Sequence, residues 1–339
     1  MTHTVLISSA GRRVGLVECM RGALKGTGRI GTIDCSRTAP ATHLVDGSWI
    51  VSPCKSPQFI REVLDLCVRE QVSVLIPTID PELPIYASTR NLFQINGTFV
   101  CISSADTVCI SSDKVVTHEW LSRHGFPTVR QASLTEVLRS KSTWALPLIV
   151  KRRNGSASIG VRIVVSWQEL EQLEAANQDS IVQEKAIGHE FTINVYVSRD
   201  GECVCTVPHW RMEVRSGEVA KGITVKDPRL MSLGRRIAES LPGAYGPMNI
   251  QCFMDDSGDL KVIEINPRFG GGYPLAHKAG APFVAWIIEE LEGHKLSYFE
   301  DWQDGLAMLR YDSAVYLPGS ALGIPQSELG MRHAQFGQT

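Results

Sequence analysis

Residues 262–272 read Val-Ile-Glu-Ile-Asn-Pro-Arg-Phe-Gly-Gly-Gly, and this segment constrains the fold more than any other part of the chain. The pattern predicts a buried strand that runs into a glycine turn. Because successive side chains of a strand point to opposite faces, Glu264 and Asn266 share one face, and Arg268 follows two residues later. These groups suit a polyphosphate bound with magnesium, since Mg²⁺ prefers oxygen ligands and arginine binds phosphate oxygens. Taken alone, the pattern also describes a strand with a solvated polar face.

Length and charge limit the classes of protein that the chain can represent. With 339 residues the chain is long enough for two or three domains, and its 43% of hydrophobic residues are typical of a globular protein. The net charge is −2, whereas proteins that bind nucleic acid usually carry an excess of positive charge, so we expect no nucleic-acid partner. Local basic groups can still bind small anions.

The sequence shows no targeting or membrane signal. No apolar run reaches the length of a membrane span, so we expect no membrane partner. The first residues enter a strand without a charged segment, so we expect no signal peptide. Nine cysteines without a CxxC pair favour reduced thiols in a cytoplasmic protein.

The N-terminal third alternates between short apolar runs and helical periodicity. Strands are predicted over 4–8, 30–34, 72–77 and 99–102, and helices over 14–25, 57–70 and 81–92. This alternation indicates a parallel, doubly wound sheet. The first turn holds Gly11 without a G-x-G-x-x-G pattern, and residues 26–31, which fit that spacing, precede a strand instead of following one. We therefore expect no dinucleotide site.

From residue 112 onward the pattern favours antiparallel strands. Helices are predicted over 113–124, 134–140, 166–176, 227–240 and 280–291. Strands are predicted over 148–152, 161–165, 180–185, 190–197, 202–208, 247–254 and 260–266. Residues 255–259 separate the last two strands and predict a hairpin. Residues 319–339, rich in Gly, Ser and Gln, are interpreted as a flexible tail.

Three further features accompany the strand of Glu264. Lys151 ends an apolar strand, and the Gly/Ser/Asn-rich residues 153–160 can present backbone N–H groups to an anion and close as a lid. Residues 181–190 form a strand that bends and re-enters a strand, and such a bend can hydrogen-bond an adenine edge. Gln251 lies across the predicted hairpin, on the expected side of Glu264. Each feature also fits a simple hairpin with solvated charges.

This order of features resembles the ATP-grasp superfamily, most closely the nucleotide domains in the large subunit of carbamoyl-phosphate synthetase and its stand-alone ligase relatives. The resemblance covers residues 1–318. It implies an α/β and α+β fold with a Rossmann-like parallel domain, a small central lid and a C-terminal antiparallel lobe. The expected boundaries are 1–111, 112–184 and 185–318, followed by the tail.

The resemblance also implies a ligand set for ATP and its metal. Glu264 and Asn266 would bind Mg²⁺ with the triphosphate, with Mn²⁺ as a substitute, and Gln251 would be an additional metal or phosphate ligand. Lys151 would hold the α and β phosphates, and Lys114, in Ser-Asp-Lys, would also reach phosphate.

The nucleoside contacts follow by the same resemblance. Glu190 matches the ribose contact. The residues that match the adenine-binding connection, largely through backbone, are Gln183, Glu184, Lys185 and Ile187.

Three arginines are candidates for contacting the groups that react. Arg268 would steady an acyl phosphate or its transition state. Arg211 and Arg215 follow a predicted strand, and family position suggests that one of them contacts the acyl phosphate or carboxylate. Two solvated arginines on one turn explain the same pattern equally well. The histidines at 189, 209 and 277 lack metal-ligand spacing and are interpreted as structural.

The N-terminal domain holds the candidates for substrate binding. Arg12 and Arg13 follow Gly11 at the first strand–helix turn, where a helix N-terminus favours anions, so one of them would hold a substrate carboxylate. Asp80 and Glu82 follow the third strand, at the edge where open α/β sheets bind ligands, so one of them would meet an amino group. A surface salt bridge between Arg13 and Glu82 is the alternative.

The leading hypothesis is an ATP- and Mg²⁺-dependent carboxylate–amine ligase that forms an amide or peptide bond through an acyl phosphate. Its partners would be a small carboxylate and an amine or amino acid, and homodimerisation is left open. The chain is a single copy without ammonia-handling or allosteric domains, which argues against carbamoyl phosphate synthesis. The alternatives are a bicarbonate-activating carboxylase and a nucleotide-binding module without turnover. The sequence names neither substrate.

Overall fold

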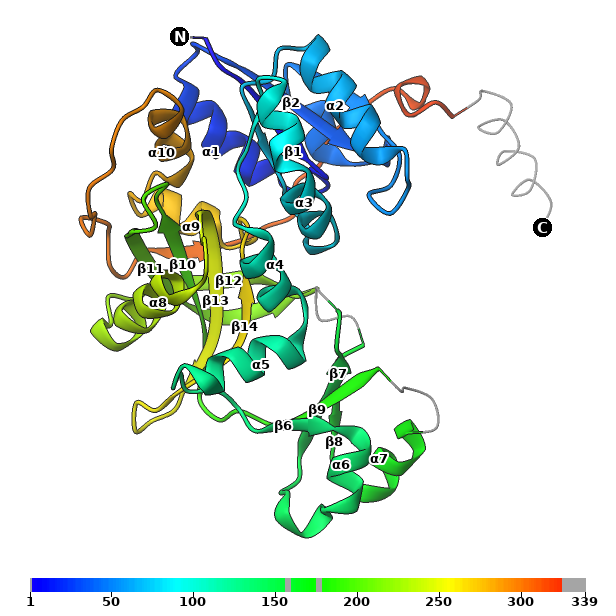
Figure 1. The fold of residues 1–339 in the computed structure, drawn as a ribbon, viewed down its shortest axis with the longest axis vertical. Helices are drawn as coiled ribbons and strands as arrows, with labels where there is room; N and C mark the ends of the chain where they lie inside the picture. The colour runs from blue at the N-terminus through cyan, green and yellow to red at the C-terminus, as the bar shows by residue number, and fades with distance from the viewer. Residues whose placement is uncertain (1, 156–159, 175–178, 325–339) are drawn as a thin grey trace, which may run out of the picture.

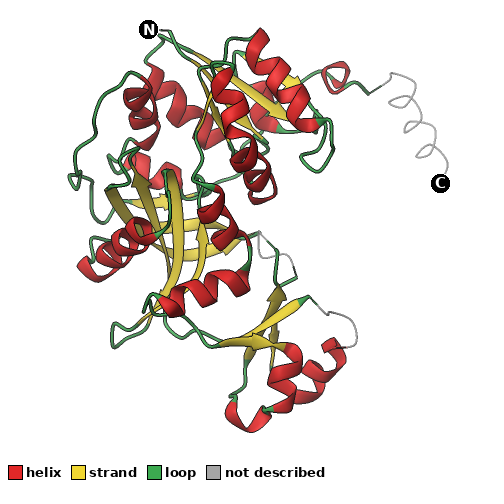
Figure 2. Ribbon diagram, in the orientation of Figure 1, coloured by secondary structure: helices red, strands yellow, loops and turns green. Residues whose placement is uncertain are grey.

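The computed structural model describes residues 2–155, 160–174 and 179–324, which are built around three β-sheets (Figures 1 and 2). In these views the N-terminal sheet lies at the top, a six-stranded sheet in the middle and a four-stranded sheet at the bottom. The mixed α/β architecture predicted from the sequence is confirmed. Every helix within the described ranges is too short or too polar to cross a membrane.

The N-terminal sheet is parallel, with strand order β3-β2-β1-β4-β5. Its strands are β1 (Thr4–Ser8), β2 (Arg29–Asp34), β3 (Gly47–Ile50), β4 (Val74–Ile76) and β5 (Phe99–Val100). Val5 and Ile7 of β1 pack in one cluster with helix α1 (Val14–Leu24). Leu6 points to the other face and packs with helices α2 (Phe59–Arg69) and α3 (Leu83–Ile95). The sheet is therefore doubly wound, as predicted.

The six-stranded sheet has the order β14-β13-β10-β11-β12-β15, and all its neighbouring strands are antiparallel. Its strands are β10 (His189–Val197), β11 (Cys203–Arg215), β12 (Glu218–Thr224), β13 (Gly246–Met254), β14 (Leu260–Asn266) and β15 (Ala307–Leu309). Helices α5 (Lys114–Arg123) and α8 (Pro228–Ser240) share a hydrophobic cluster with one face.

On the other face of this sheet, Tyr196 belongs to the cluster that also holds α1, α9 (Tyr273–Lys278) and α10 (Phe283–Leu291). One continuous core therefore joins the six-stranded sheet to the N-terminal domain. This core fixes the position of the two sheets relative to each other.

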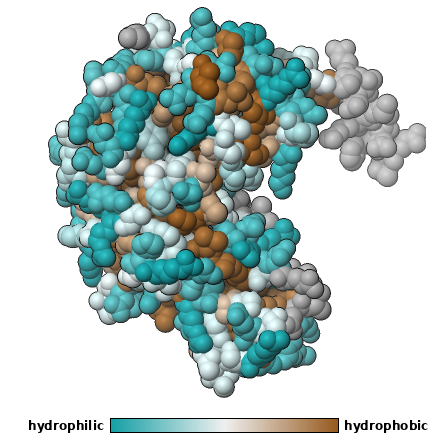
Figure 3. Space-filling model, viewed as in Figure 1, coloured by the Kyte–Doolittle hydropathy of each residue, from teal (hydrophilic) through white to brown (hydrophobic). Residues whose placement is uncertain are grey.

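The four-stranded sheet has its own core. Its order is β6-β9-β7-β8, with β6 (Gln131–Ser133), β7 (Leu148–Arg152), β8 (Arg162–Val164) and β9 (Ser180–Glu184). Helices α6 (Leu134–Arg139) and α7 (Trp167–Glu174) cover one face in a separate cluster. The space-filling view shows that the molecule is hollowed between this part and the N-terminal domain (Figure 3).

The structure corrects several predicted elements. The chain passes from the four-stranded sheet to the six-stranded sheet between β9 and β10. Strand β11 runs to Arg215, well beyond the predicted end at 208, because its charged end, which carries no apolar pattern, pairs with β12. The elements that the pattern missed are β3, β6, β12, β15, α4 (Ala105–Ser112) and α9. All are short or lack a clear apolar face.

Some predictions fall partly outside the described residues. These are the end of the predicted helix 166–176, half of the loop 153–160 and most of the predicted tail. At the start of that tail, η4 (Gly319–Leu322) forms a 3₁₀ helix. The other 3₁₀ helices are η1 (Pro40–His43), η2 (Asp80–Glu82) and η3 (Lys141–Thr143).

Candidate active site

Two adjoining cavities meet at strands β13 and β14. The first, which we call the inter-sheet cavity, lies between the four- and six-stranded sheets and has a volume of about 310 Å³. The second, which we call the inner cavity, lies between the six-stranded sheet and the N-terminal domain and has a volume of about 180 Å³. Arg211, Gln251 and Glu264 line both cavities. A ligand that spans the two cavities must therefore pass these three side chains.

The walls of the inter-sheet cavity combine apolar and polar groups. Ile149 and Ile163 come from the four-stranded sheet, and Phe253 and Ile263 face them from the six-stranded sheet. Apolar walls with a few polar groups are typical of a pocket for a small organic ligand. The chain crosses from β9 to β10 along the rim of this cavity.

Several sequence-predicted nucleoside residues lie at that rim. Gln183, Glu184 and Lys185 line the cavity, and the Gln183 amide donates to Gln131 Oε1 at 2.7 Å. Ile187 does not line it, and 80% of its surface is exposed. Its side chain therefore contributes no wall, because the bend turns it toward solvent.

Two lysines bring positive charge to the same cavity. Lys151 is buried at the end of β7, and burial, with the nearby charge of Lys114, lowers its pKa to about 8 although Glu264 acts in the opposite direction. Lys114 begins helix α5, donates to the Gly155 carbonyl and lies 3.8 Å from Glu264 Oε1. The structure therefore brings together two cations and one carboxylate that are far apart in sequence. Such a cluster suits phosphate oxygens with a bound cation.

Glu190 and Arg211 form an ion pair between β10 and β11. Arg211 Nε lies 3.0 Å from Glu190 Oε1, and its Nη1 lies 3.2 Å from Thr192 Oγ1. Burial raises the pKa of Glu190, and the charge of Arg211 partly opposes this rise. Strand β11 therefore directs Arg211 into the site, whereas the sequence pattern placed Arg211 beyond the end of the predicted strand.

The predicted metal edge is formed by the β13–β14 hairpin. The strand register places Gln251 directly opposite Glu264 and Asn249 opposite Asn266. Asn266 Nδ2 donates to Asn249 Oδ1 at 3.3 Å, and Asn249 Nδ2 donates to the Arg268 carbonyl at 3.1 Å. Asn249 thus ties the glycine turn to the sheet.

Arg268 is held by a carboxylate of the N-terminal domain. Its Nε and Nη2 donate to the two carboxylate oxygens of Asp80 at 2.6 and 2.7 Å. Burial acts to lower the pKa of Arg268, but the Asp80 carboxylate outweighs burial and raises it. Asp80 is therefore in the site, but as the partner of Arg268.

Arg12 and Arg13 line the inner cavity together with Glu218. The Arg13 guanidinium donates to the Thr78 carbonyl at 2.7 Å. Burial, with a smaller contribution from Arg268, lowers the pKa of Arg13 to about 10. Arg13 remains a cation at neutral pH, so the inner cavity offers a buried positive group to an anion.

Two further predicted site residues lie outside both cavities. Glu82 is fully buried, and its carboxylate accepts from the hydroxyls of Ser8 and Ser9, both at 2.7 Å, and from the backbone N–H groups of Thr78 and Ile79. Glu82 therefore braces the ends of β1 and β4 and is not placed to meet a substrate amino group.

Arg215 is the second of these residues. Its side chain is 62% exposed, pairs with Glu213 at 2.8 Å and lines neither cavity. Residues four apart share one face of a regular strand, but irregularities in the register between Arg211 and Val214 interrupt β11, and Arg215 at its end remains in solvent. The structure therefore favours Arg211 as the arginine of this pair that can reach a ligand.

Sequence reasoning also missed residues that line the inner cavity. Glu218 lies on β12, which the pattern did not predict. Asn249 and Thr192 could have been found, because Asn249 shares the face of Gln251 by strand alternation and Thr192 pairs with Gln251 in the β10–β13 register. His209, buried beneath the glycine turn, has its pKa lowered to about 3 by burial and is therefore neutral, which fits a structural role.

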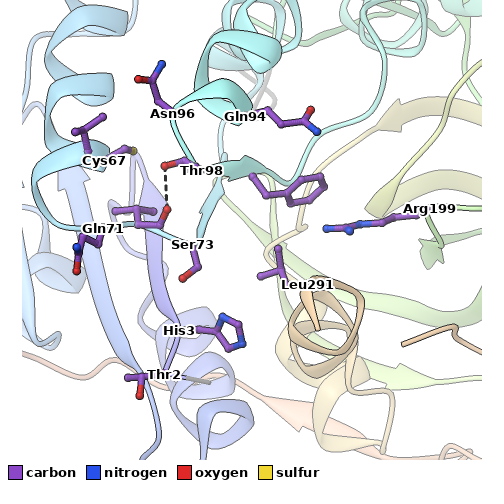
Figure 4. Close-up of a pocket in the computed structure, with 14 residues that line it drawn as sticks. Thr2, His3, Cys67, Gln71, Ser73, Gln94, Asn96, Thr98, Arg199 and Leu291 are labelled. Carbon is purple, nitrogen blue, oxygen red and sulfur yellow. Dashed lines mark hydrogen bonds between the residues drawn. The ribbon is translucent and has the colours of Figure 1, made fainter. Parts of the chain in front are cut away.

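Another hollow, of about 590 Å³, lies at the end of the N-terminal sheet where its strands begin (Figure 4). His3, Ser73 and Thr98 line it just before β1, β4 and β5 begin. Ligands of open α/β sheets bind at the carboxyl ends of the strands, and this is the other end. We therefore do not assign this hollow to the site.

Comparison with known proteins identifies the two main parts of the chain. Residues 111–272 match the family model described as an ATP-grasp domain, and residues 5–101 match one described as a PylC-like, N-terminal domain. A phosphoribosylamine–glycine ligase of Escherichia coli O157:H7 is 24% identical over 286 residues, which cover 72% of this chain and 64% of that protein. The chain thus spans less than two thirds of that relative's length.

A more distant relative supports the same family. The large chain of carbamoyl phosphate synthase from Thermotoga sp. strain RQ2 is 21% identical over 272 residues, covering 70% of this chain and 24% of that one. The fold agrees with the structure of N5-carboxyaminoimidazole synthetase from Staphylococcus aureus complexed with ADP, with a TM-score of 0.74 and 16% identity over 98% of this chain and 87% of that chain.

These matches and the three-sheet architecture define the class of protein. Residues 111–272 of the chain form an ATP-grasp domain, as the resemblance in its sequence predicted. This domain follows the segment 5–101 that matches the PylC-like, N-terminal domain.

Proposed function

We propose that this protein is an ATP- and Mg²⁺-dependent carboxylate–amine ligase that forms an amide or peptide bond through an acyl phosphate and releases ADP and phosphate. The observation that carries the proposal is the position of Glu264, which lines the inter-sheet and inner cavities together. A nucleotide in the first cavity would present its terminal phosphate at Glu264, where a carboxylate in the second cavity could receive it.

The inter-sheet cavity supports the nucleotide part of the proposal. Lys114 and Lys151 would hold phosphate oxygens as two converging point charges. The rim residues Gln183 to Lys185, with the backbone at Ile187, would contact the adenine, and Glu190 would contact the ribose. The apolar walls would exclude water from the transferred phosphoryl group.

The residues at the β13–β14 edge fit a magnesium ion. Glu264, Asn266 and Gln251 offer carboxylate and amide oxygens, which are hard ligands of the kind Mg²⁺ prefers. Within the described residues, no group of three or more His, Cys, Asp or Glu side chains could hold a metal alone. Phosphate oxygens would therefore complete the coordination, as is usual for Mg²⁺. Bound there, the ion would neutralise charge on the phosphates.

The inner cavity supports the acceptor part of the proposal. Arg268, oriented by Asp80, and Arg211, oriented by Glu190, would stabilise the charge that develops on the acyl phosphate. Arg13, with Arg12 at the rim, would hold a substrate carboxylate. These are positioning and electrostatic roles, which is what phosphoryl transfer demands of a protein.

The decisive experiment is a screen for ADP release. The purified protein is incubated with MgATP and with amino acids, small carboxylates and bicarbonate, singly and in pairs. We expect ADP to form only with a carboxylate and an amine together, and an amide product to accumulate. ADP release with bicarbonate alone would point instead to a carboxylase. Tight ATP binding without ADP release in any mixture would contradict the proposal.

A further inference from the structure

Glu218 places a carboxylate in the wall of the inner cavity. It begins strand β12, and its side chain lies against the glycine turn, since a Cβ added at Gly271 would fall 2.6 Å from Glu218 Cδ. Arg310 fixes the carboxylate from outside, with Nη1 donating to Oε2 at 3.0 Å. In the part of the chain that the structure describes, Oε1 of Glu218 accepts no hydrogen bond. One carboxylate oxygen therefore remains available to a ligand.

Glu218 is an anion at neutral pH. Burial opposes its ionisation, but the charge of Arg13, the hydrogen bond from Arg310 and the charge of Arg12 outweigh burial and lower the pKa below its usual value. A carboxylate that stays ionised is a good partner for an ammonium group.

Arg13 supplies the opposite charge in the same cavity. No carboxylate of the described residues lies within 4 Å of the Arg13 guanidinium, so Arg13 and Glu218 influence each other electrostatically without forming a direct ion pair. Two opposite charges that line one cavity without touching are complementary to a ligand that carries both signs.

The other carboxylates of the inner cavity are already engaged. Both oxygens of Asp80 accept from Arg268. Glu264 faces Lys114 and stands at the proposed metal edge. Glu218 is therefore the carboxylate best placed to receive a positive group of a substrate.

We propose that the inner cavity binds a small amino acid by its two charged ends, with the ammonium group on Glu218 and the carboxylate on Arg13. This inference rests on the proposed function and names one substrate of that reaction as a free amino acid. The volume of about 180 Å³ matches roughly six water molecules at about 30 Å³ each, which is enough room for a small amino acid. An N-acylated amino acid, which lacks the positive charge, would be rejected.

The test is calorimetric titration of the full chain with each of the standard amino acids, glycine and β-alanine included, with and without MgATP. We expect at least one small amino acid to bind. Glu218→Gln should weaken this binding by at least about 10-fold, because a charge-assisted hydrogen bond is lost. The matched control is Glu213→Gln on the same β-hairpin, whose carboxylate pairs with Arg215 and Lys221 at the surface and lines neither cavity. It should leave binding unchanged.

A second measurement keeps the test independent of the folding of the variant. The N-acetyl derivative and the methyl ester of the amino acid that binds are titrated into the wild-type protein, and both should bind at least about 10-fold more weakly. Equal binding of the N-acetyl derivative, or an unchanged affinity in Glu218→Gln, would overturn the inference. So would a wild-type protein that binds MgATP but no amino acid. Failure to bind MgATP would instead refute the proposed function, so the two failures are distinguishable.

Discussion

Asp80 and Arg268 form a two-point ion pair across 188 residues of sequence, with N–O distances of 2.6 and 2.7 Å. The pair joins the end of β4 in the N-terminal domain to the glycine turn after β14. Arg268 thereby acquires a single orientation over the edge of Glu264 and Asn266. The N-terminal domain thus contributes to the proposed chemistry through the orientation of a residue on another sheet.

Asp80→Asn should therefore lower kcat by about 10- to 100-fold, because a small displacement of a positioned group has effects of this size. The KM for ATP should change little, since Asp80 does not line the inter-sheet cavity. Steady-state kinetics test this split. Asp65→Asn, which removes an exposed ion pair with Arg61, is the control and should leave kcat and the KM for ATP unchanged. A variant of Asp80 with normal kcat would refute the positioning role.

Glu264→Gln should reduce Mg²⁺-dependent turnover by at least about 100-fold, because the metal contributes several kcal/mol of charge stabilisation. The melting temperature should stay close to that of the wild type, since the side chain lies at a cavity wall and is not in the core. ADP release at several Mg²⁺ concentrations, with a thermal melt of each sample, measures both effects. Full activity in the variant would show that the metal assignment is wrong.

Lys151 should make the affinity for MgATP depend on pH. With a pKa of about 8 in the free protein, the ammonium is charged below that pH and becomes neutral above it. The Kd for MgATP should therefore rise above pH 8, by up to about tenfold per pH unit. Equilibrium titrations between pH 7 and pH 10 measure the trend.

Two variants test whether Lys151 is the group responsible. Lys151→Ala should bind ATP about 10-fold more weakly at pH 7. In Lys151→Arg the affinity for MgATP should not decline near pH 8, because arginine keeps its charge. The same pH dependence in all three proteins would assign the titration to another group.

Gly272→Ala should destabilise the fold by about 1–3 kcal/mol, which is typical of overpacking. A Cβ there would fall 2.6 Å from Cε1 and 2.7 Å from Nε2 of His209, a fully buried ring that cannot move aside. Gly22→Ala on the exposed side of α1, where an added Cβ meets nothing within 4 Å, is the control and should stabilise by up to about 1 kcal/mol. Urea unfolding compares them. Equal stability of both variants would contradict the steric argument.

Variants of Glu82 distinguish a structural role of this residue from a role in binding substrate. Glu82→Ala should destabilise the protein by about 1–3 kcal/mol for each buried donor left without an acceptor. Glu82→Gln should cost much less, because an amide oxygen still accepts the two backbone N–H groups and the serine hydroxyls can reorient. The KM values of the folded Gln variant should equal those of the wild type. A large rise in the KM for the amine would restore Glu82 as a substrate contact.

Local physical rules account for the part of the site that the sequence predicted. Strand alternation places Glu264 and Asn266 on one face, and the hairpin signal at 255–259 brings Gln251 across from Glu264. The alternation of strands and helices predicted the parallel sheet. Each of these depends only on residues that are close in sequence.

The remaining part was decided by contacts between distant segments. Whether Asp80 meets a substrate or Arg268 depends on how β4 and β14 approach each other, and no local pattern encodes that distance. Glu82 was mistaken for a ligand contact because burial of a carboxylate is visible only after folding. Glu218 was missed because β12 carries too weak an apolar pattern to be predicted. By itself the sequence determined which chemical groups share a strand face, since a β-strand repeats every two residues. Only the tertiary structure decided which groups from different sheets converge on one cavity, because that follows from packing across the core that joins the two domains.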